Sequence, residues 1–203
     1  MERRRLTDAA GRRRRAALAG HDGDEATARA LLDDPDPAVR STALGALARA
    51  GALRAPDVEQ ALSDADPGVR RRACEEAAAM VDVDLLPVLA DGERSVVEAA
   101  AWALGERGAE AAEAVDALAA VAREHDDALC REAAVAALGA IGDPRGLATV
   151  LAAASSDRPA VRRRAVVALA AFDGPEVEAA LHAALEDRDW QVRQAAEDLL
   201  AEN

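Results

Sequence analysis

The sequence is poor in aromatic residues and has no lysine. Among its 203 residues there are one Phe, two Trp and no Tyr, so a hydrophobic core must be built from Ala, Leu and Val. Such small side chains allow helices to pack near the lower end of the usual spacing of roughly 8–10 Å. All 25 basic residues are Arg. We attribute the lack of Lys to genome composition or salt adaptation and not to a function.

Long apolar runs and paired cysteines are also missing. No apolar run approaches the roughly 20 residues of a membrane-spanning helix, and no apolar stretch follows the N-terminal arginines as it would in a signal peptide. Cys74 and Cys130 fall inside predicted helices, and we expect Cys130 to be a small buried apolar residue. With a net charge of −13, the composition predicts an acidic, soluble, cytoplasmic protein.

A short motif returns about every thirty residues. It reads Asp-Pro-Ala-Val-Arg at residues 36–40 and recurs, closely or in altered form, at 66–70, 93–97, 127–131, 158–162 and 189–193. We call the residues equivalent to the Val of this motif the anchors: Val39, Val69, Val96, Cys130, Val161 and Val192. Their spacings of 27 to 34 residues, with helical periodicity inside each unit, predict a protein of stacked helical repeats. The unequal spacings argue against an idealised consensus design.

Each repeat is predicted to form two helices, A and B. Ala and Leu favour helices, and no segment alternates as a strand would, so the predicted fold is all-α. The predicted A helices cover residues 24–33, 56–63, 83–91, 110–124, 144–155 and 175–187. The predicted B helices cover residues 37–50, 67–81, 94–107, 128–141, 159–171 and 190–201.

Capping residues mark the ends of these helices. Asp36 and Asp66 each precede a Pro, which is the pattern of an Asp N-cap followed by Pro at the first helical position. Pro87 lies inside the third A helix and predicts a short or kinked helix there. Glycines in a left-handed conformation are expected to end B helices at Gly51, Gly108, Gly142 and Gly174.

The N-terminal segment differs from the rest. Arg3–Arg5 and Arg12–Arg15 give residues 1–15 a charge of +5, against −18 for the remainder. Leu18 falls in the position of Leu47, as if this segment were the second half of a repeat. We therefore predict an Arg-rich N-terminal cap at residues 1–20 and one continuous repeat domain at 21–203.

This pattern of an acidic cap, Val-Arg, Ala and Leu on a two-helix unit resembles HEAT-like repeats, particularly the short kind named after phycobilisome lyases. The resemblance covers nearly the whole chain and implies a right-handed α-solenoid of about six repeats plus an N-terminal capping helix. In that family, Asp and Arg of successive repeats form a hydrogen-bonded ladder along the loops. The matching residues here are Asp36, Asp66, Glu93, Asp127 and Asp189, with Arg40, Arg70, Arg131, Arg162 and Arg193. Val97 replaces the Arg of the third repeat and Arg158 the acid of the fifth, so interruptions are expected at both.

The B helices of HEAT-like arrays line a concave surface, which makes their face opposite the core the candidate binding surface. Trp102 stands among charges on this face, where a large aromatic side chain is typical of an interface anchor; packing against an Ala-rich helix is the alternative. We expect Trp190 to pack at the C-terminal end. The candidate partner-binding residues are Arg71, Arg72, Glu75, Glu98, Trp102, Glu106, Glu132, Arg163, Arg164 and Val167.

Enzymes with the same type of repeat are the main functional alternative. HEAT-like deoxyhypusine hydroxylase holds two irons with repeated His-Glu pairs. This sequence has no such pair, and His21, His125 and His182 occupy three different places in the repeat. A bilin lyase-like activity has no distinct motif here. The N-terminal arginines could pair with phosphates, but the acidic net charge and the lack of stacking aromatics argue against nucleic acid.

We therefore predict a non-catalytic scaffold that binds an unidentified protein partner on its concave B-helix surface. The prediction includes no catalytic residue, cofactor or metal. We expect a monomer that binds neither nucleic acid nor a membrane.

Overall fold

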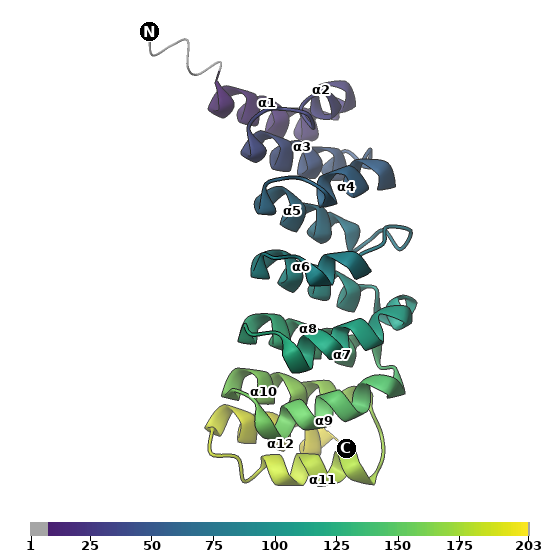
Figure 1. The fold of residues 1–203 in the computed structure, drawn as a ribbon, viewed down its shortest axis with the longest axis vertical. Coiled ribbons are helices and arrows are strands. Elements are labelled where there is room, and N and C mark those ends of the chain that lie inside the picture. Colours follow the sequence, from purple (N-terminus) through teal and green to yellow (C-terminus); the bar gives the residue numbers. More distant parts are fainter. Residues whose placement is uncertain (1–7, 203) are drawn as a thin grey trace. The chain divides into compact units, whose positions relative to one another are not determined.

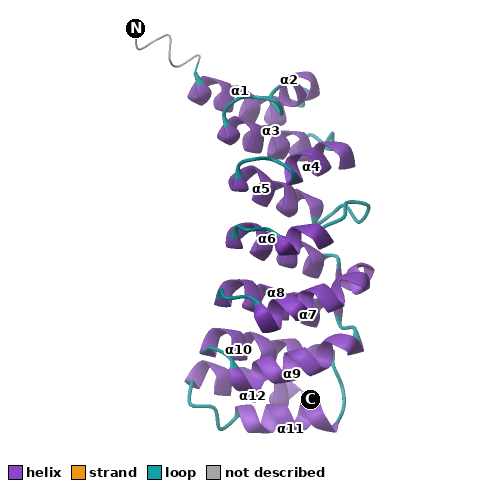
Figure 2. Cartoon of the chain, in the orientation of Figure 1, coloured by secondary structure: helices purple, strands orange, loops and turns teal. Residues whose placement is uncertain are grey.

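A computed structural model describes residues 8–202, and the predicted Arg3–Arg5 cluster lies outside them. Within residues 8–202 the regular structure is entirely helical (Figures 1 and 2). The helices form two compact units, which divide between Leu85 and Leu86. Each unit is an α-solenoid segment in which the second helices of successive repeats, the B helices, lie side by side.

Within residues 8–85, the first unit contains five α-helices. They are α1 (Ala9–Asp22), α2 (Glu25–Ala30), α3 (Pro37–Arg49), α4 (Ala55–Leu62) and α5 (Pro67–Ala77). The B helices α1, α3 and α5 are consecutive neighbours, while α2 and α4 are A helices that pack against α3 and α5.

The second unit contains seven α-helices and several 3₁₀ segments. They are η2 (Leu86–Ala90), α6 (Arg94–Glu106), η3 (Gly108–Ala114), α7 (Val115–Glu124), α8 (Ala128–Ile141), η4 (Pro144–Gly146), α9 (Leu147–Ser156), α10 (Pro159–Ala168), η5 (Leu169–Ala171), α11 (Pro175–Ala184) and α12 (Trp190–Glu202). The B helices α6, α8, α10 and α12 are consecutive neighbours. The A helices α7, α9 and α11 pack on α8, α10 and α12.

The predicted capping residues begin the B helices. The Asp36 carboxylate accepts a hydrogen bond from the Ala38 amide at 2.9 Å, and Asp66 accepts one from Gly68 at 2.9 Å. These bonds satisfy amides that the first helical turn leaves without a partner. At the other end of α8, Gly142 has φ of 68° and occupies the predicted left-handed cap.

Two expectations about local structure need correction. Gly174 has a positive φ of 125° but lies at the N-cap of α11 instead of ending a B helix. The predicted helix at 110–124 is divided, because Ala111 leaves helical geometry and the segment before Val115 is a 3₁₀ helix. Near Pro87 the structure has only the five-residue 3₁₀ helix η2, which confirms the expected short helix.

The core repeats the same positions in the B helices between α1 and α12. We number positions from the anchor, so that Val39 is position 0. Positions 0, +4, +5 and +8 of α3 are Val39, Ala43, Leu44 and Leu47, whose side chains are at most 1% exposed. These positions lie on one side of the helix, because at 3.6 residues per turn they fall within an arc of about 140°.

Neighbouring B helices approach closely at a small residue in position +9. A Cβ added to Gly139 of α8 would lie 2.9 Å from the Ala168 Cα of α10, and one added to Gly20 of α1 would lie 2.6 Å from the Ala46 Cα of α3. In both pairs, position +9 of one B helix faces position +7 of the next. The small side chains that dominate this sequence thus allow neighbouring B helices to pack closely.

The loops carry the predicted Arg–Asp ladder, but with other aspartates. The Arg40 guanidinium donates to both oxygens of Asp64, at 2.7 and 2.6 Å, and a third nitrogen donates to the Asp34 carbonyl at 2.8 Å. The ladder acid is therefore Asp64, two residues before the N-cap Asp66, which instead caps its own helix. The same fork joins Arg12 to Asp34, Arg131 to Asp157 and Arg162 to Asp187.

The two expected interruptions have different outcomes. The fifth repeat keeps its ladder, because Asp157 supplies the carboxylate for Arg131 although Arg158 replaces the N-cap acid. In the third repeat Val97 is fully buried and cannot act as a donor. The ladder position that follows holds His125, whose Nδ1 accepts the Asp127 amide at 3.0 Å. We call each Arg–Asp pair of the ladder a rung. In this rung Val97 stands in place of the Arg, and His125 stands in place of the Asp.

The ladder also corrects the register of the first helix. Because Arg12 pairs with Asp34 as Arg40 pairs with Asp64, the anchor of α1 is Gly11. Ala19, and not Leu18, then occupies the position of Leu47. Leu18 takes position +7, and its side chain is 50% exposed.

Candidate functional site

The predicted partner-binding residues lie on B helices of both units. Arg71, Arg72 and Glu75 belong to α5 of the first unit, and the others belong to α6, α8 and α10 of the second. The two groups are described separately, because each belongs to its own compact unit.

The three candidates on α5 are engaged with one another. Arg71 pairs with Glu75, and Arg72 contacts Glu75 at 3.3 Å and Glu76 at 2.7 Å. The Arg72 guanidinium lies against α3, since a Cβ added to Gly45 would meet it at 2.2 Å. Burial raises the pKa of Glu76 despite this arginine. These charges are therefore committed to contacts within the first unit.

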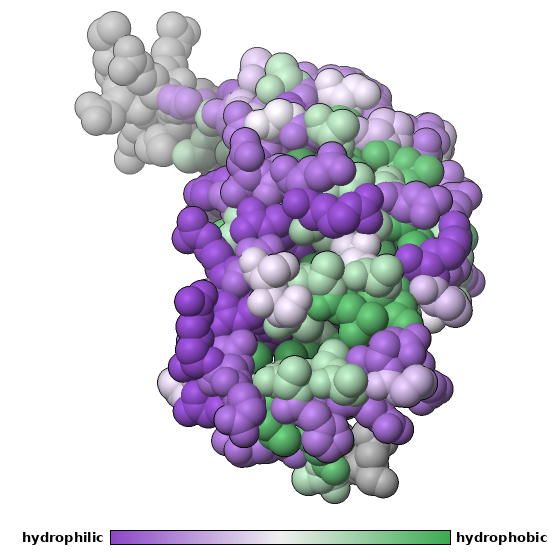
Figure 3. Space-filling model, turned by 60° about the horizontal axis from the view of Figure 1, so that its bottom comes forward, coloured by the Kyte–Doolittle hydropathy of each residue, from purple (hydrophilic) through white to green (hydrophobic). Residues whose placement is uncertain are grey.

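The candidates of the second unit form a row on the outward face of the B helices. Position +6 of α6, α8, α10 and α12 is occupied by Trp102, Ala136, Val167 and Asp198. The side chains of Trp102 and Val167 are each 46% exposed. Figure 3 shows that apolar side chains reach the molecular surface between hydrophilic ones. At 46% exposure, Trp102 is accessible to a partner and is not enclosed by the core.

Val167 stands between two hollows, which together we call the α10 groove. One hollow, of about 360 Å³, lies over α8 and α10 and has a floor of small residues that includes Ala136 and Gly139. The other, of about 350 Å³, lies over α10 and α12 and is lined by Arg163, Arg164, Val167, Trp190, Gln191, Gln194, Ala195 and Asp198. Both hollows contain Arg164 and Val167. The close approach of α8 and α10 at Gly139 produces the shallow floor.

Trp190 was not predicted to belong to this surface. Instead of packing at the C-terminal end, its side chain is 64% exposed and lines the α10 groove. It occupies the first position of α12 and lines the same hollow as Arg163 and Val167 of the neighbouring B helix. The sequence held one signal for this role: Trp190 is an aromatic residue at the start of a B helix, where the other repeats have Pro, Arg or Ala.

The charges around the groove are of both signs. Arg164 lies 3.6 Å from Glu132 of α8, so its charge is partly offset. Within residues 8–202, Arg163 has no ion-pair partner. Glu98 and Glu106 are exposed on α6, beside Trp102. The outward face therefore offers an uncommitted cation at α10 and acidic groups at α6.

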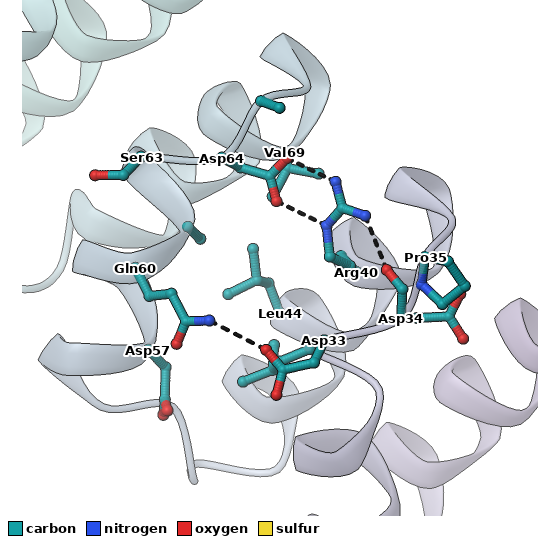
Figure 4. A pocket seen from close by; sticks show the side chains of 13 residues that line it. Asp33, Asp34, Pro35, Arg40, Leu44, Asp57, Gln60, Ser63, Asp64 and Val69 are labelled. Carbon is teal, nitrogen blue, oxygen red and sulfur yellow. Dashed lines mark hydrogen bonds and ion pairs between the residues drawn. The ribbon is translucent and has the colours of Figure 1, made fainter.

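A second cavity, of about 540 Å³, lies in the first unit between the loop before α3 and helices α4 and α5 (Figure 4). Leu44 points into it, and four aspartates line it: Asp33, Asp34, Asp57 and Asp64. Three of these pair with Arg12, Arg29 and Arg40. The arginine hydrogen bonds lower the pKa of Asp34 and Asp64. Arginines thus already compensate three of the four carboxylates that line the cavity, while Asp33 accepts a hydrogen bond from Gln60 at 3.1 Å.

The histidines and cysteines lie apart from the groove. His21 is in α1, His125 precedes α8 and His182 is in α11. Over the described part of the chain, no group of three His, Cys, Asp or Glu side chains could hold a metal ion. Burial raises the pKa of the Cys130 thiol to about 11, which agrees with its predicted role as a small buried residue. In residues 8–202 no helix is long and apolar enough to cross a membrane.

Several solved structures share this arrangement of helices. An engineered protein superposes with a TM-score of 0.66 at 21% identity, covering 88% of this chain and 97% of that chain. A designed armadillo repeat protein in complex with the peptide (KR)4 superposes with a TM-score of 0.64 at 18% identity, covering 86% and 97%. At these identities the likeness establishes the fold alone. Comparison with curated protein sequences finds no match.

The sequence itself matches a repeat family over most of its length. The matched segments are residues 25–93, 55–139, 83–158 and 115–201, and the family is described as HEAT repeats. The segments overlap, as expected when one repeat pattern fits the chain in successive registers. The chain belongs to the HEAT repeat family.

Proposed function

We propose that this protein is a non-catalytic scaffold that binds a protein partner on the outward B-helix face of its second unit. The observation that carries the proposal is the α10 groove, where Val167 and Trp190 are exposed beside the unpaired cation Arg163. Exposed aromatic side chains next to Arg are the residue types that dominate binding energy at interfaces.

The groove favours an extended segment that carries an apolar side chain and a carboxylate. An apolar side chain fits over the Ala and Gly floor between α8 and α10, where only small side chains stand in its way. A carboxylate can pair with Arg163 through two parallel hydrogen bonds. Trp102, one B helix further, extends the apolar contact. A designed protein with the same fold is known in complex with a peptide, which supports the use of this fold for peptide binding.

The principal contact does not include Arg71, Arg72 and Glu75, because these residues already pair with each other and with Glu76. Glu98, Glu106 and Glu132 would border the bound segment. Such exposed charges contribute to specificity and association rate more than to affinity.

Peptide selection tests the proposal without a known partner. A random peptide library is selected against the wild-type protein, and the affinities of the selected peptides are measured by fluorescence polarisation. We expect peptides with carboxylates and bulky apolar residues, whose affinity falls at least thirtyfold with Arg163→Glu or Val167→Glu. A thirtyfold loss corresponds to about 2 kcal/mol. Trp102→Ala should lower the affinity only of peptides long enough to reach from the α10 groove to α6.

The control substitution is Glu59→Arg in α4, which is exposed in the first unit and should leave the affinities unchanged. Circular dichroism must show that each variant keeps its helix content. A selection without binders, or binders whose affinity does not respond to the groove substitutions, contradicts the proposed surface.

A further inference from the structure

We propose that α12 of one copy of this chain docks onto α1 of a second copy, in the register that joins neighbouring B helices inside each unit. This contact involves neither Val167 nor the α10 groove and is independent of the proposed function. It differs from the monomer expected from the sequence.

The interfaces between consecutive B helices inside each unit, which we call the inner interfaces, show which positions of a B helix contact its neighbours. Position +9 of one helix faces position +7 of the next, as Gly139 faces Ala168. Position +1 supplies the ladder arginine to the loop before the next helix, as Arg162 does to Asp187. Positions +1, +5 and +9 therefore form the face toward the next B helix. Position +7 meets the preceding B helix at Ala168, and position 0 does so where the Cys130 thiol donates to the Arg94 carbonyl of α6. Position +4 lies within about 60° of both on the helix, so these three positions form the face toward the preceding B helix.

Within residues 8–202, the face of α12 that corresponds to the one toward a next B helix is exposed. Its residues are Arg193, Glu197 and Ala201, and the last two are exposed. In α3, α6, α8 and α10 position +5 is a buried Leu, Ala or Val, whereas α12 has Glu197. Arg193 donates to the Asp187 carbonyl at 2.7 Å, as the other ladder arginines do to their loops. Within residues 8–202 no carboxylate accepts a hydrogen bond from the Arg193 guanidinium, whereas each of the ladder arginines Arg12, Arg40, Arg131 and Arg162 donates to both oxygens of an aspartate.

Within residues 8–202, the face of α1 that corresponds to the one toward a preceding B helix is exposed as well, and its charge is opposite. Position +4 is a buried Ala in α3, α6, α8 and α10, but it is the exposed Arg15 in α1. Arg14 precedes it and is also exposed, and Leu18 in position +7 is 50% exposed. Within the described residues, neither Arg14 nor Arg15 has an ion-pair partner.

The inner register brings these replacements together. Since position +9 is level with +7 of the next helix, position +5 is level with +3 and +4. Glu197 of one copy then faces Arg14 and Arg15 of the other, and Ala201 faces Leu18. In the neighbouring pair α10 and α12, the same two positions, +9 and +7, are held by Ala170 of η5, which continues α10, and Leu199. The charged pair stands where inner interfaces have apolar side chains, so the contact depends on opposite charges as well as on packing.

This contact joins two different surfaces of the same chain, so it does not close on itself as a symmetric dimer would. Heterologous contacts of this kind produce rings or open chains that grow with concentration. Because the interacting charges are exposed, salt should weaken the association.

Sedimentation equilibrium tests the inference on the full chain. The wild-type mass should rise with protein concentration in 50 mM NaCl and fall toward the monomer in 500 mM NaCl. Arg14→Glu/Arg15→Glu, and separately Glu197→Arg, should weaken self-association at least tenfold. Combining all three substitutions in one chain restores opposite charges and should restore association. Glu59→Arg, a charge reversal of the same kind on α4, is the control and should associate like the wild type.

A wild type that stays monomeric under all these conditions overturns the inference. Association that persists in both reversed variants, or that the combined variant does not recover, also overturns it, because the contact then lies elsewhere. Glu197→Gln, which only removes the charge, replaces Glu197→Arg if circular dichroism shows that the latter is unfolded.

Discussion

At the scale of single residues, glycine determines how closely the B helices pack. Gly139 lies in the middle of the α8–α10 contact, where an added Cβ would lie 2.6 Å from the Ala168 Cβ and 2.9 Å from its Cα. Real Cβ atoms do not approach backbone this closely, so the two helices would have to separate. The same contact forms the floor of the α10 groove, which connects core packing to the proposed binding surface.

Gly139→Ala should therefore destabilise the protein although alanine is the better helix former. The gain in helix propensity is about 0.5–1 kcal/mol, whereas forcing an extra methyl group into a packed contact costs about 1–3 kcal/mol. We expect a net loss of about 1 kcal/mol in the free energy of unfolding, measured by urea titration with circular dichroism. Gly92→Ala is the control, because no atom lies within 4 Å of its added Cβ. Equal free energies of unfolding for the Gly139 variant and the wild type would contradict this prediction, because α10 could then move away from α8 without loss of stability.

At the scale of helices and loops, the sequence predicted most of what the structure shows. The anchors, together with an N-cap Asp, a Pro at the first helical position or both, predicted α3, α5, α8 and α10 to within a few residues, because N-caps and Pro constrain the backbone locally. The ladder was assigned to the wrong aspartates, because Asp64 and Asp66 are the same residue type two positions apart. Only the geometry shows that one caps a helix and the other reaches the preceding repeat.

The candidate site was predictable in part for the same reason. The helical period placed Trp102 and Val167 on the outward face. It did not show that Arg71 and Arg72 are tied up in local ion pairs or that Trp190 faces the groove, since both depend on rotamers and on the neighbouring helix. Leu18 was misplaced by one residue because α1 lacks the anchor Val that fixes the register elsewhere.

The missing rung in the second unit can be rebuilt by two substitutions. Val97 and His125 occupy the positions of the ladder that hold an Arg and an Asp in other repeats. Val97→Arg alone should destabilise the protein, since it removes a fully buried apolar side chain and adds a charge without a partner. His125→Asp alone should keep the hydrogen bond to the Asp127 amide, because Asp64 makes the same bond to Asp66 at 2.8 Å.

The double variant should be more stable than the sum of the single effects predicts, by about 1 kcal/mol or more, because the new Arg and Asp can pair in the ladder geometry. A double-mutant cycle of urea unfolding measures this coupling energy. If Val97→Arg does not fold, folding of the double variant alone demonstrates the rescue. Strictly additive effects would mean that the loop before α8 cannot adopt the geometry of the other rungs.

At the scale of the whole molecule, the ladder makes stability depend on acidity. Hydrogen bonds from arginine lower the pKa of Asp34, Asp64, Asp157 and Asp187. A carboxylate whose folded pKa lies below its unfolded value of about 3.9 contributes its full stability above that value. As the pH falls below about 4, the unfolded chain binds protons first, and the free energy of unfolding decreases until the folded carboxylates are protonated too.

Removing one ladder carboxylate should therefore lower stability at neutral pH and also flatten its loss in acid. Asp187→Asn leaves the nearly buried Arg162 (side chain 3% exposed) without its anion, and we expect a loss of about 2 kcal/mol or more at pH 7. Between pH 4 and pH 2.5 the variant should lose less than the wild type, because one proton-linked group is gone. Urea midpoints at pH 7, 5, 4, 3 and 2.5 measure both effects, with Glu178→Gln as an exposed control outside the ladder. An acid slope equal to that of the wild type would assign the acid sensitivity to carboxylates other than those of the ladder.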